Sequence, residues 1–347
     1  MTRHRYVVGL LAVLLSAPLG RTAEVERYLP EDTEIVLNLN VRQIFDSPIV
    51  KKNFLEMAQE SLRGNNEIQD VLKDLGFDPF TDLERIVLAS PGGADKDRGL
   101  VIVHGQFDVA KFKAKAAEVA KDDDAHLKIH KVLGGKHLLY EVNVPERDDP
   151  LFVALAGRDT LLASPGKDYV IDALKKAGKE AKNGDPKPAP SGKSSGVLAL
   201  DKPVLKNKKF EALLEKVDAR QSVSLAMVKT PELSKALEQV PGDVKAMLET
   251  IRAIGGGLTI GDDVKLELVV TTKTAQNAEE LHKSAKAGLD LMLAGLATVT
   301  QTNPSPEIEL VVDILKTVRV KNNGASVVIK GRITSDVIED ALKKKGK

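Results

Sequence analysis

Short blocks of alternating and periodic hydrophobic positions predict a mixture of strands and helices along this chain. Residues 34–41 alternate apolar and polar side chains for part of their length, with Ile35, Leu37 and Leu39 on one side, as a half-buried strand does. Residues 108–121 instead repeat apolar side chains every three or four positions, which is typical of an amphipathic helix. Ser47-Pro48 predicts a helix start, because serine caps free amides and proline suits the first turn.

Pairs of strand blocks are joined by turn residues, which predicts hairpins and therefore antiparallel pairing. Gly134-Gly135 and Asn323-Gly324 suit two-residue hairpin turns, because both positions need a positive φ. The expected strand pairs are 85–89 with 99–107, 126–132 with 136–143, 151–156 with 159–163, 252–260 with 264–272, and 317–322 with 325–332. Such hairpins interspersed with helices predict an α+β fold.

The chain divides into two halves. Residues 182–195 are rich in proline, glycine, serine and lysine, as linkers are, which separates a domain at 24–181 from one at 196–347. Both halves follow the order strand, helices, hairpin, helix, hairpin, helix, and GVLALD at 196–201 resembles IVLNLN at 35–40. We therefore expect two tandem, duplicated halves, each an antiparallel sheet with helices on one face. The alternative is coincidence, because such element orders are common in α+β proteins.

The first 23 residues have the three-part layout of a secretory signal peptide. Arg3 and Arg5 precede an apolar run at 6–19, and small residues follow. A retained membrane anchor is the alternative, but a span takes about 20 apolar residues and this run is shorter. We expect an exported protein that is soluble in the periplasm or outside the cell after cleavage, without a retained transmembrane segment.

Composition narrows the possible functions. The chain has no cysteine, which excludes disulfides, thiol catalysis and a lipid-anchored cysteine. The leader carries three arginines and no acid, so the remainder has 48 basic and 50 acidic residues and a net charge of −2. Such a balance gives no general attraction to nucleic acid. Aromatic residues make up 3% of the chain, which counts against sugar-binding and single-strand-binding platforms.

Two sequence motifs match hydrolase patterns without their structural context. Residues 192–196 fit G-x-S-x-G, but a linker precedes them and a strand follows, the reverse of a nucleophile elbow. Ser164 and Lys167 fit S-x-x-K, but no S-D-N or K-T-G partner is present, so we interpret Ser164 as a helix N-cap. We therefore assign no catalytic residue and no cofactor.

Three histidines fall within the hairpin around Gly134-Gly135. With that turn, His130 faces Leu139, and His137 and Glu141 lie diagonally from His130 on the same face. Diagonal histidines are close enough to share a zinc ion, so His130, His137 and Glu141 are weak candidates for a metal site. The competing interpretation is a solvated polar face, with Leu127, Ile129 and Tyr140 towards the core, and we expect no metal.

The segment YLPEDTEIVLNLNVRQIFDSPIVK at 28–51 carries a recurring pattern, L-P-x-D-T-x-x-V-x-x-x-N-V-R-x-x-x-x-S-P. It includes Leu29, Pro30, Asp32, Thr33, Val36, Asn40, Val41, Arg42, Ser47 and Pro48. The segment resembles the start of a group of exported, uncharacterised bacterial proteins of planctomycete type. The resemblance implies export and a duplicated α+β fold, and it implies no reaction and no site residues.

The leading functional hypothesis is a non-enzymatic exported protein that binds a protein or another envelope component. One alternative is a hydrolase or metal-dependent enzyme whose site is assembled from distant residues. A second alternative is a small-molecule or lipid carrier that uses the cleft between the two halves.

Overall fold

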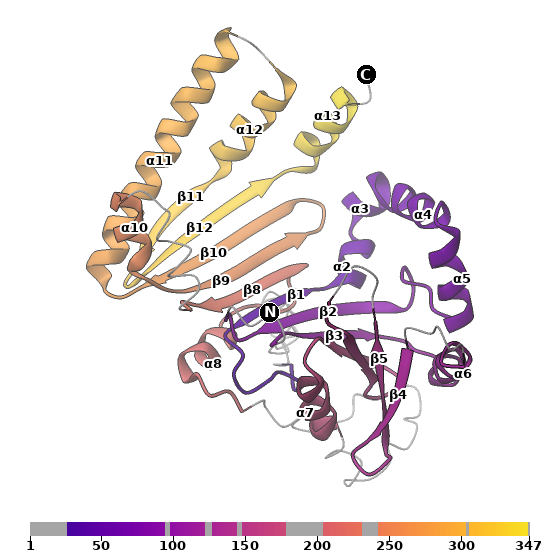
Figure 1. Cartoon of the computed structure of the whole chain (residues 1–347). Coiled ribbons are helices and arrows are strands. Elements are labelled where there is room, and N and C mark those ends of the chain that lie inside the picture. The colour runs from indigo at the N-terminus through magenta and orange to yellow at the C-terminus, as the bar shows by residue number, and fades with distance from the viewer. Residues whose placement is uncertain are drawn as a thin grey trace, which may run out of the picture.

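A single antiparallel sheet of twelve strands runs through the molecule (Figure 1). The computed structural model describes residues 26–93, 98–121, 127–143, 148–177, 204–230, 242–302 and 305–345. The predicted leader, the 182–195 linker, the G-x-S-x-G match, His126 and the expected strand at 196–201 lie outside the described residues. The strand order is β11-β12-β10-β9-β8-β1-β2-β3-β7-β6-β5-β4.

The first half of the chain contributes seven strands to this sheet. Its elements are β1 (Ile35–Leu39), α2 (Val41–Asp46), α3 (Pro48–Asn53), α4 (Leu55–Arg63), α5 (Asn66–Leu75), β2 (Leu83–Ser90), β3 (Leu100–Gly105), α6 (Val109–Val119), β4 (Leu127–Val132), β5 (His137–Val142), β6 (Leu151–Leu155), β7 (Thr160–Ser164) and α7 (Lys167–Ala177). Every predicted hairpin of this half is present, and Ser47 caps α3 by accepting a hydrogen bond from the Val50 amide.

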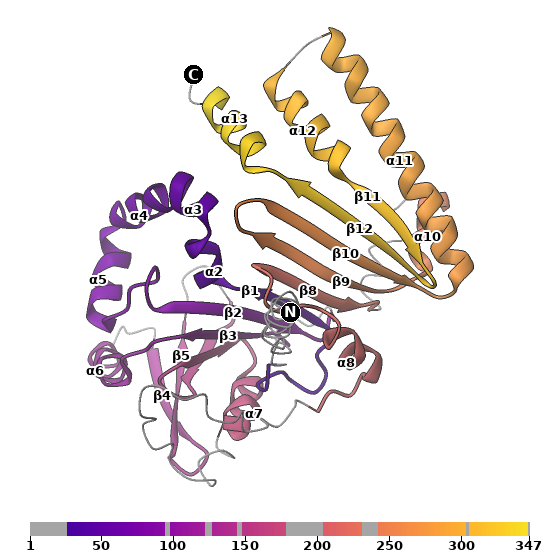
Figure 2. The same ribbon diagram turned by 180° about the vertical axis from the view of Figure 1, so that it is seen from behind.

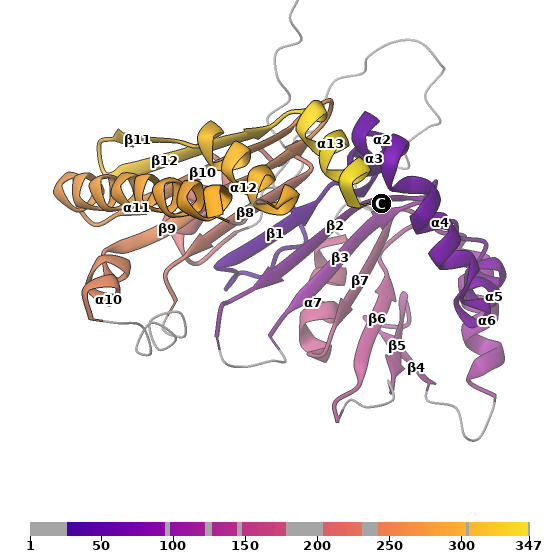
Figure 3. The same ribbon diagram turned by 90° about the horizontal axis from the view of Figure 1, so that it is seen from above.

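The second half contributes the other five strands. Its elements are α8 (Lys208–Leu214), β8 (Val223–Val228), α10 (Gly242–Glu249), β9 (Ile251–Ile260), β10 (Val264–Thr272), α11 (Ala275–Thr302), α12 (Pro306–Thr317), β11 (Arg319–Asn323), β12 (Ser326–Ile333) and α13 (Ser335–Lys345). The β11 and β4 ends of the sheet lie at opposite ends of the molecule (Figure 3). Among the described residues, no helix is both long and apolar enough to cross a membrane.

The two halves are joined by direct pairing of β1 with β8, from Ile35 opposite Met227 to Leu39 opposite Val223. The side-chain amides of Asn38 and Asn40 donate hydrogen bonds across this junction to the carbonyl oxygen of Ala219, at 3.1 and 2.7 Å. The predicted α+β class and antiparallel pairing are therefore confirmed, but the halves share one sheet. The duplication stays a prediction.

Helices pack on both faces of the sheet, whereas we expected them on one. The larger core lies on the face covered by α7 and α8, which we call the α7 face, and it contains Ile102, Leu162, Leu174 and Phe210. The smaller core lies on the opposite face, the α11 face, where Ala278 and Leu281 of α11 pack against β10 and β12. Helices α7 and α8 lie below the central strands in Figures 1 and 2, away from α11–α13.

The first strand buries the side opposite to the one its pattern indicated. Val36 and Asn38 are buried on the α7 face, whereas Ile35, Leu37 and Leu39 are half-buried on the α11 face. The side-chain nitrogen of Asn38 donates to the carbonyl oxygen of Ala219 and lies 3.4 Å from the Ser224 hydroxyl, which offsets part of the cost of burial, whereas its Oδ1 has no hydrogen-bond partner among the described residues.

The glycine run in β9 allows close packing on both sides of that strand. A Cβ on Gly255 would lie 3.0 Å from Leu213 of α8, and one on Gly256 would lie 2.1 Å from the Glu267 carbonyl oxygen. Gly256 also has a φ of 149°, which other residues rarely adopt. Glycine at these positions therefore allows the neighbouring helix and strand to approach the β9 backbone closely.

The residues of the L-P-x-D-T…N-V-R…S-P pattern have structural roles. Leu29 and Thr33 are fully buried, Arg42 donates to the carbonyl oxygen of Phe80 at 3.0 Å, and Ser47 caps α3. Asp32 accepts hydrogen bonds from Tyr169, at 2.6 Å, and from Arg98. The residues of this pattern therefore hold the segments before and after β1 in place through burial, hydrogen bonds and a helix cap.

Core and open positions on the sheet should differ in their response to truncation. We expect Leu162→Ala, at a fully buried position, to lower the free energy of unfolding by about 2–5 kcal/mol, because it leaves a cavity. Leu88→Ala, at a position 37% exposed, should cost about 1 kcal/mol or less. Urea unfolding of both variants measures this, and equal losses would contradict the assignment of the two faces.

Candidate functional site

The histidine hairpin forms in the predicted register, with His130 opposite Leu139 and His137 opposite Val132. Two side chains hydrogen-bond to Glu141: its Oε2 lies 2.8 Å from His130 Nε2, and its Oε1 accepts from Lys128 at 3.1 Å. These hydrogen bonds, from Lys128 first and His130 second, hold the pKa of Glu141 below its ordinary value.

His137 does not join this pair. Burial, together with the charges of Lys136 and Lys113, lowers the pKa of His137, which places this ring in basic surroundings. Across the described parts of the chain, no three His, Asp or Glu side chains are grouped so that they could hold a metal ion. The structure therefore brings His130 and Glu141 together and leaves His137 apart.

We expected one face of the hairpin to be polar and the other apolar, and the structure differs from this. Leu139 shares the face of His130 and is fully buried, because that face packs into the α7-side core. Tyr140, on the other face, is buried against Phe112 of α6, with ring centroids 5.2 Å apart. Ile129 is exposed at the sheet edge.

A buried acid–histidine network fastens the first described residues to the α7 face. Glu26 Oε2 lies 2.7 Å from both His104 Nε2 and an Arg85 nitrogen, and His104 Nδ1 lies 3.3 Å from Thr160 Oγ1. Burial alone would raise the pKa of Glu26, but the hydrogen bond and charge of His104 and the charge of Arg85 outweigh it and lower the pKa.

The order carboxylate, histidine, hydroxyl resembles that of a hydrolytic triad, but Thr160 is 1% exposed and therefore closed to a substrate. The sequence reasoning missed this network, because 78 residues separate Glu26 from His104. The serine of the S-x-x-K match is also fully buried. Ser164 ends β7 and hydrogen-bonds to the carbonyl oxygen of Gly99, so it is not the N-cap that we expected.

A cavity of about 1170 Å³ opens at one end of the sheet, and we call it the sheet-end cleft. It runs along the start of β2, the end of β3, the start of β7, the end of β6 and the start of β5, beside α6. Its apolar lining comes from Phe107, Leu138, Tyr140 and Leu155. Its charged lining consists of Asp82, Glu84, Asp108, Lys113, Lys136, His137, Arg158 and Asp159.

Three of the four carboxylates of the cleft accept hydrogen bonds from neutral groups of the fold, and Glu84 has no side-chain partner among the described residues. Asp82 accepts from the Asp78 amide at 2.7 Å, and Asp108 caps α6 by accepting from two amides at 3.0 Å. Asp159 accepts from the Thr160 hydroxyl at 3.2 Å. By contrast, no side-chain hydrogen bond or ion pair joins Lys113, Lys136 or Arg158 to another described residue.

The middle strands are apolar on both faces but bury only the α7 face. In β1, β3 and β8, buried side chains alternate with half-buried ones, although the sequences are IVLNL, LVIVHG and VSLAMV. Strands with apolar side chains on both sides are usually covered on both sides. Here the α11–α12 layer lies at the β11 end and α4–α6 lie at the β4 end (Figure 3). Between them, α2 packs against β2, and α3 meets α13 through the ion pair of Lys52 and Glu339, so that helices cover part of the central strands.

The half-buried side chains of the α11 face form two continuous rows, because directly paired residues point to the same side of a sheet. The first row, from β10 to β6, is Leu266, Leu258, Val223, Leu39, Ile86, Val103, Leu161 and Leu155. The second row is Leu268, Gly256, Leu225, Leu37, Leu88, Val101, Ala163 and Val153. Its β10 end is covered, because Leu268 packs against the smaller core, and Gly256 contributes no side chain. We call these two rows the apolar face. Leu88 is 37% exposed and Leu266 is 41% exposed.

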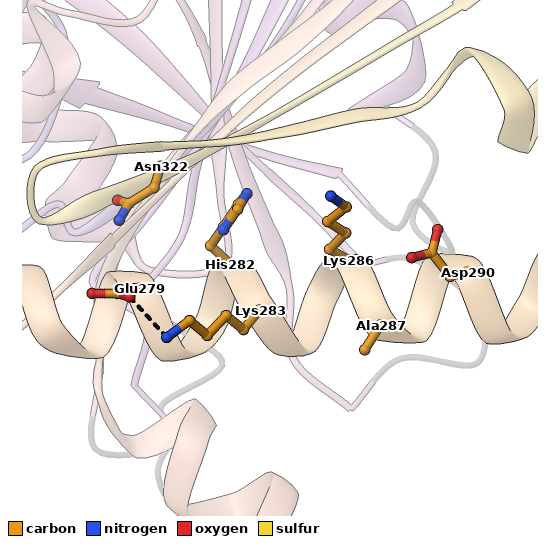
Figure 4. Close-up of a pocket in the computed structure, with 7 residues that line it drawn as sticks. All are labelled: Glu279, His282, Lys283, Lys286, Ala287, Asp290 and Asn322. Atoms are coloured by element: carbon orange, nitrogen blue, oxygen red, sulfur yellow. Dashed lines mark ion pairs between the residues drawn. The ribbon is translucent and has the colours of Figure 1, made fainter.

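A shallower pocket of about 570 Å³ lies between α11 and the edge strand β11 (Figure 4). Asn322 comes from β11, and the other lining residues, Glu279, His282, Lys283, Lys286, Ala287 and Asp290, project from α11. Glu279 and Lys283 pair with each other at 2.8 Å, and His282 Nε2 lies 3.3 Å from the Val320 carbonyl oxygen. These contacts are those of a solvated helix face.

Comparisons with known proteins add little to this picture. No protein-family model matches the sequence, and no curated protein matches it. Among solved structures, the chain is similar to one described as "Structure of crystal form I of TP0453", with 11% sequence identity and a TM-score of 0.40. The alignment covers 93% of this chain and 98% of that one. A likeness this weak carries no argument about function.

The metal interpretation of the hairpin can be tested directly. Because Glu141 is already paired and His137 lies among lysines, we expect His130→Ala with His137→Ala to leave zinc binding at neutral pH unchanged. Metal analysis of both purified proteins measures this. Zinc bound in a fixed ratio to the unaltered protein and lost in the double variant would contradict the expectation.

The Glu26 network should make stability depend on pH. The pKa of Glu26 in the folded protein lies below the ordinary value of 4.5. The contribution of this carboxylate to the free energy of unfolding is therefore fully present above that pH and is lost as the pH falls through the folded pKa. We expect Glu26→Gln to lower the free energy of unfolding by about 1.5–3 kcal/mol at neutral pH. The difference from the unaltered protein should shrink in acid. A difference that stays constant down to the acid transition would show that Glu26 is not ionised in the fold.

Proposed function

We propose that this protein is an exported, non-enzymatic binding protein of the cell envelope or periplasm, and that it engages its partner through the apolar face. The signal-like leader supports export. The observation that supports binding is the continuous apolar surface, which reaches solvent at Leu88 in the middle of the sheet and at Leu266 on β10.

Exposure of this apolar surface to water costs free energy, which a partner that covers the surface recovers. Each Å² of apolar surface removed from water contributes about 25 cal/mol, so a partner that covers two rows of aliphatic side chains gains binding energy without any new polar contact. Monomeric proteins rarely leave large continuous apolar patches open, and such patches mark interaction sites.

The apolar side chains on this face are less buried than those on the α7 face, so folding gains less free energy from them. The core is complete on the α7 face, where Val87, Ile102 and Leu162 are buried on three neighbouring strands. Polar residues at Leu37, Leu88 and Val101 would satisfy the same strand pairing. Their aliphatic character is therefore explained by a partner better than by folding.

A capture experiment with a matched pair of variants tests the proposal. The purified protein is used to capture components from the envelope fraction of its source, alongside Leu88→Gln/Leu266→Gln and a control, Leu291→Gln. Leu291 is 75% exposed on α11 and lies outside the apolar face. We expect a component, protein or lipid, that the unaltered protein and the control retain and the double variant loses.

Urea unfolding checks that all three proteins are equally folded. The proposal fails if only background components return, or if the double variant retains the same components as the unaltered protein.

A further inference from the structure

We infer that the occupant of the apolar face is an amphiphile whose hydrocarbon chain lies along the first apolar row and whose anionic headgroup lies in the sheet-end cleft. This inference rests on the proposed function, because it names the class of molecule that the same face binds.

The chemistry of the face favours hydrocarbon over polypeptide. All eight side chains of the first row are aliphatic, from Leu266 to Leu155. The backbone groups of these inner strands are already paired within the sheet, so neither side chains nor backbone can bond to a peptide lying on them. A peptide on this surface would lose hydrogen bonds to water without replacing them, whereas a hydrocarbon chain has none to lose.

The apolar face is continuous with the cleft. Leu155 ends the first row and also lines the sheet-end cleft, beside Leu138 and Tyr140. The row crosses eight strands, which at about 4.8 Å per strand spacing is roughly 34 Å. One leaflet of a bilayer has about 15 Å of hydrocarbon, so the row is long enough for an extended acyl chain.

The charge of the cleft indicates the sign of the headgroup. The lining as a whole carries four carboxylates and three cations, and Glu84 at the start of β2, like Lys113, Lys136 and Arg158, has no side-chain partner among the described residues. The sign of the headgroup therefore follows from the β5 end of the cleft. Lys113 and Lys136 lie near His137, at the β5 end of the cleft where Leu138 and Tyr140 provide its apolar lining. A carboxylate or phosphate on an acyl chain fits this junction of basic and apolar side chains.

Three amphiphiles with the same dodecyl chain separate the contributions of tail and headgroup. Laurate is anionic, dodecyl maltoside is neutral and dodecyltrimethylammonium is cationic, and each is titrated below its micelle concentration by calorimetry. We expect laurate to bind most tightly and dodecyltrimethylammonium most weakly.

Two sets of variants assign the parts of the site. Val103→Ala/Leu161→Ala, in the part of the first row that a dodecyl chain reaches from the cleft, should weaken all three ligands by about tenfold, because the tail loses apolar contact, whereas Leu291→Gln should not. Urea unfolding checks that this variant is folded. Lys113→Gln/Lys136→Gln should weaken laurate by about fivefold and leave dodecyl maltoside unchanged. Lys209→Gln/Lys265→Gln, at exposed lysines outside the cleft, is the matched charge control.

The outcomes separate this inference from the proposed function. The amphiphile inference is overturned if no amphiphile binds, or if the protein binds only intact vesicles of phosphatidylcholine and phosphatidylglycerol. Equal affinity for all three ligands overturns the anionic headgroup. If laurate does not bind but capture still returns a protein that Leu88→Gln/Leu266→Gln loses, the amphiphile is wrong and the binding function stands. If capture also fails, both are wrong.

Discussion

The antiparallel pairing of β1 with β8 is the constraint on which the rest of the structure depends. Without it, the chain would form two smaller sheets, each with an open edge strand at this position. With it, five pairs of residues align from Ile35 with Met227 to Leu39 with Val223, and side-chain amides of Asn38 and Asn40 reach across to Ala219. The edges that remain are β11 and β4, and both carry lysine, which discourages pairing with other chains.

The junction also determines which surface is open. Buried Asn38 and Val36 turn one side of β1 towards the α7-side core, so Leu37 and Leu39 must lie on the other side. Because β8 and β2 pair directly with β1, the same choice extends to Leu225 and Leu88. One continuous sheet therefore yields one continuous apolar face, and the sheet-end cleft lies where that face meets the charged ends of five strands.

Much of the fold could be predicted from the sequence, because local signals determine it. Gly134-Gly135 locates one hairpin in its predicted register. Asn323-Gly324 locates another, although Asn323 itself pairs with Ser326, so the turn lies one residue later than predicted. Ser47 and Ser305 start helices by capping them. The union of the two halves could not be predicted, since pairing between residues about 190 apart has no local signal. The face buried by β1 was predicted wrongly, because the side-chain nitrogen of Asn38 hydrogen-bonds to Ala219, a residue about 180 positions away that the local pattern does not reveal. Of the candidate site, only the register of the histidine hairpin was predicted. The cleft and the Glu26 network could not be predicted, because the cleft is lined by residues from five strands and the network joins residues far apart in the sequence.

Hydrogen–deuterium exchange of the β1 and β8 amides tests the central claim most directly. If the two halves share one sheet, the amides that donate across the junction, such as Asn40 to Ser222 and Val228 to Glu34, will exchange as slowly as those of β3 and β9, because all lie inside one sheet. Exchange of the β1 and β8 amides at the rate of surface loops, with β3 and β9 still protected, would show that the halves are separate and that no continuous apolar face exists.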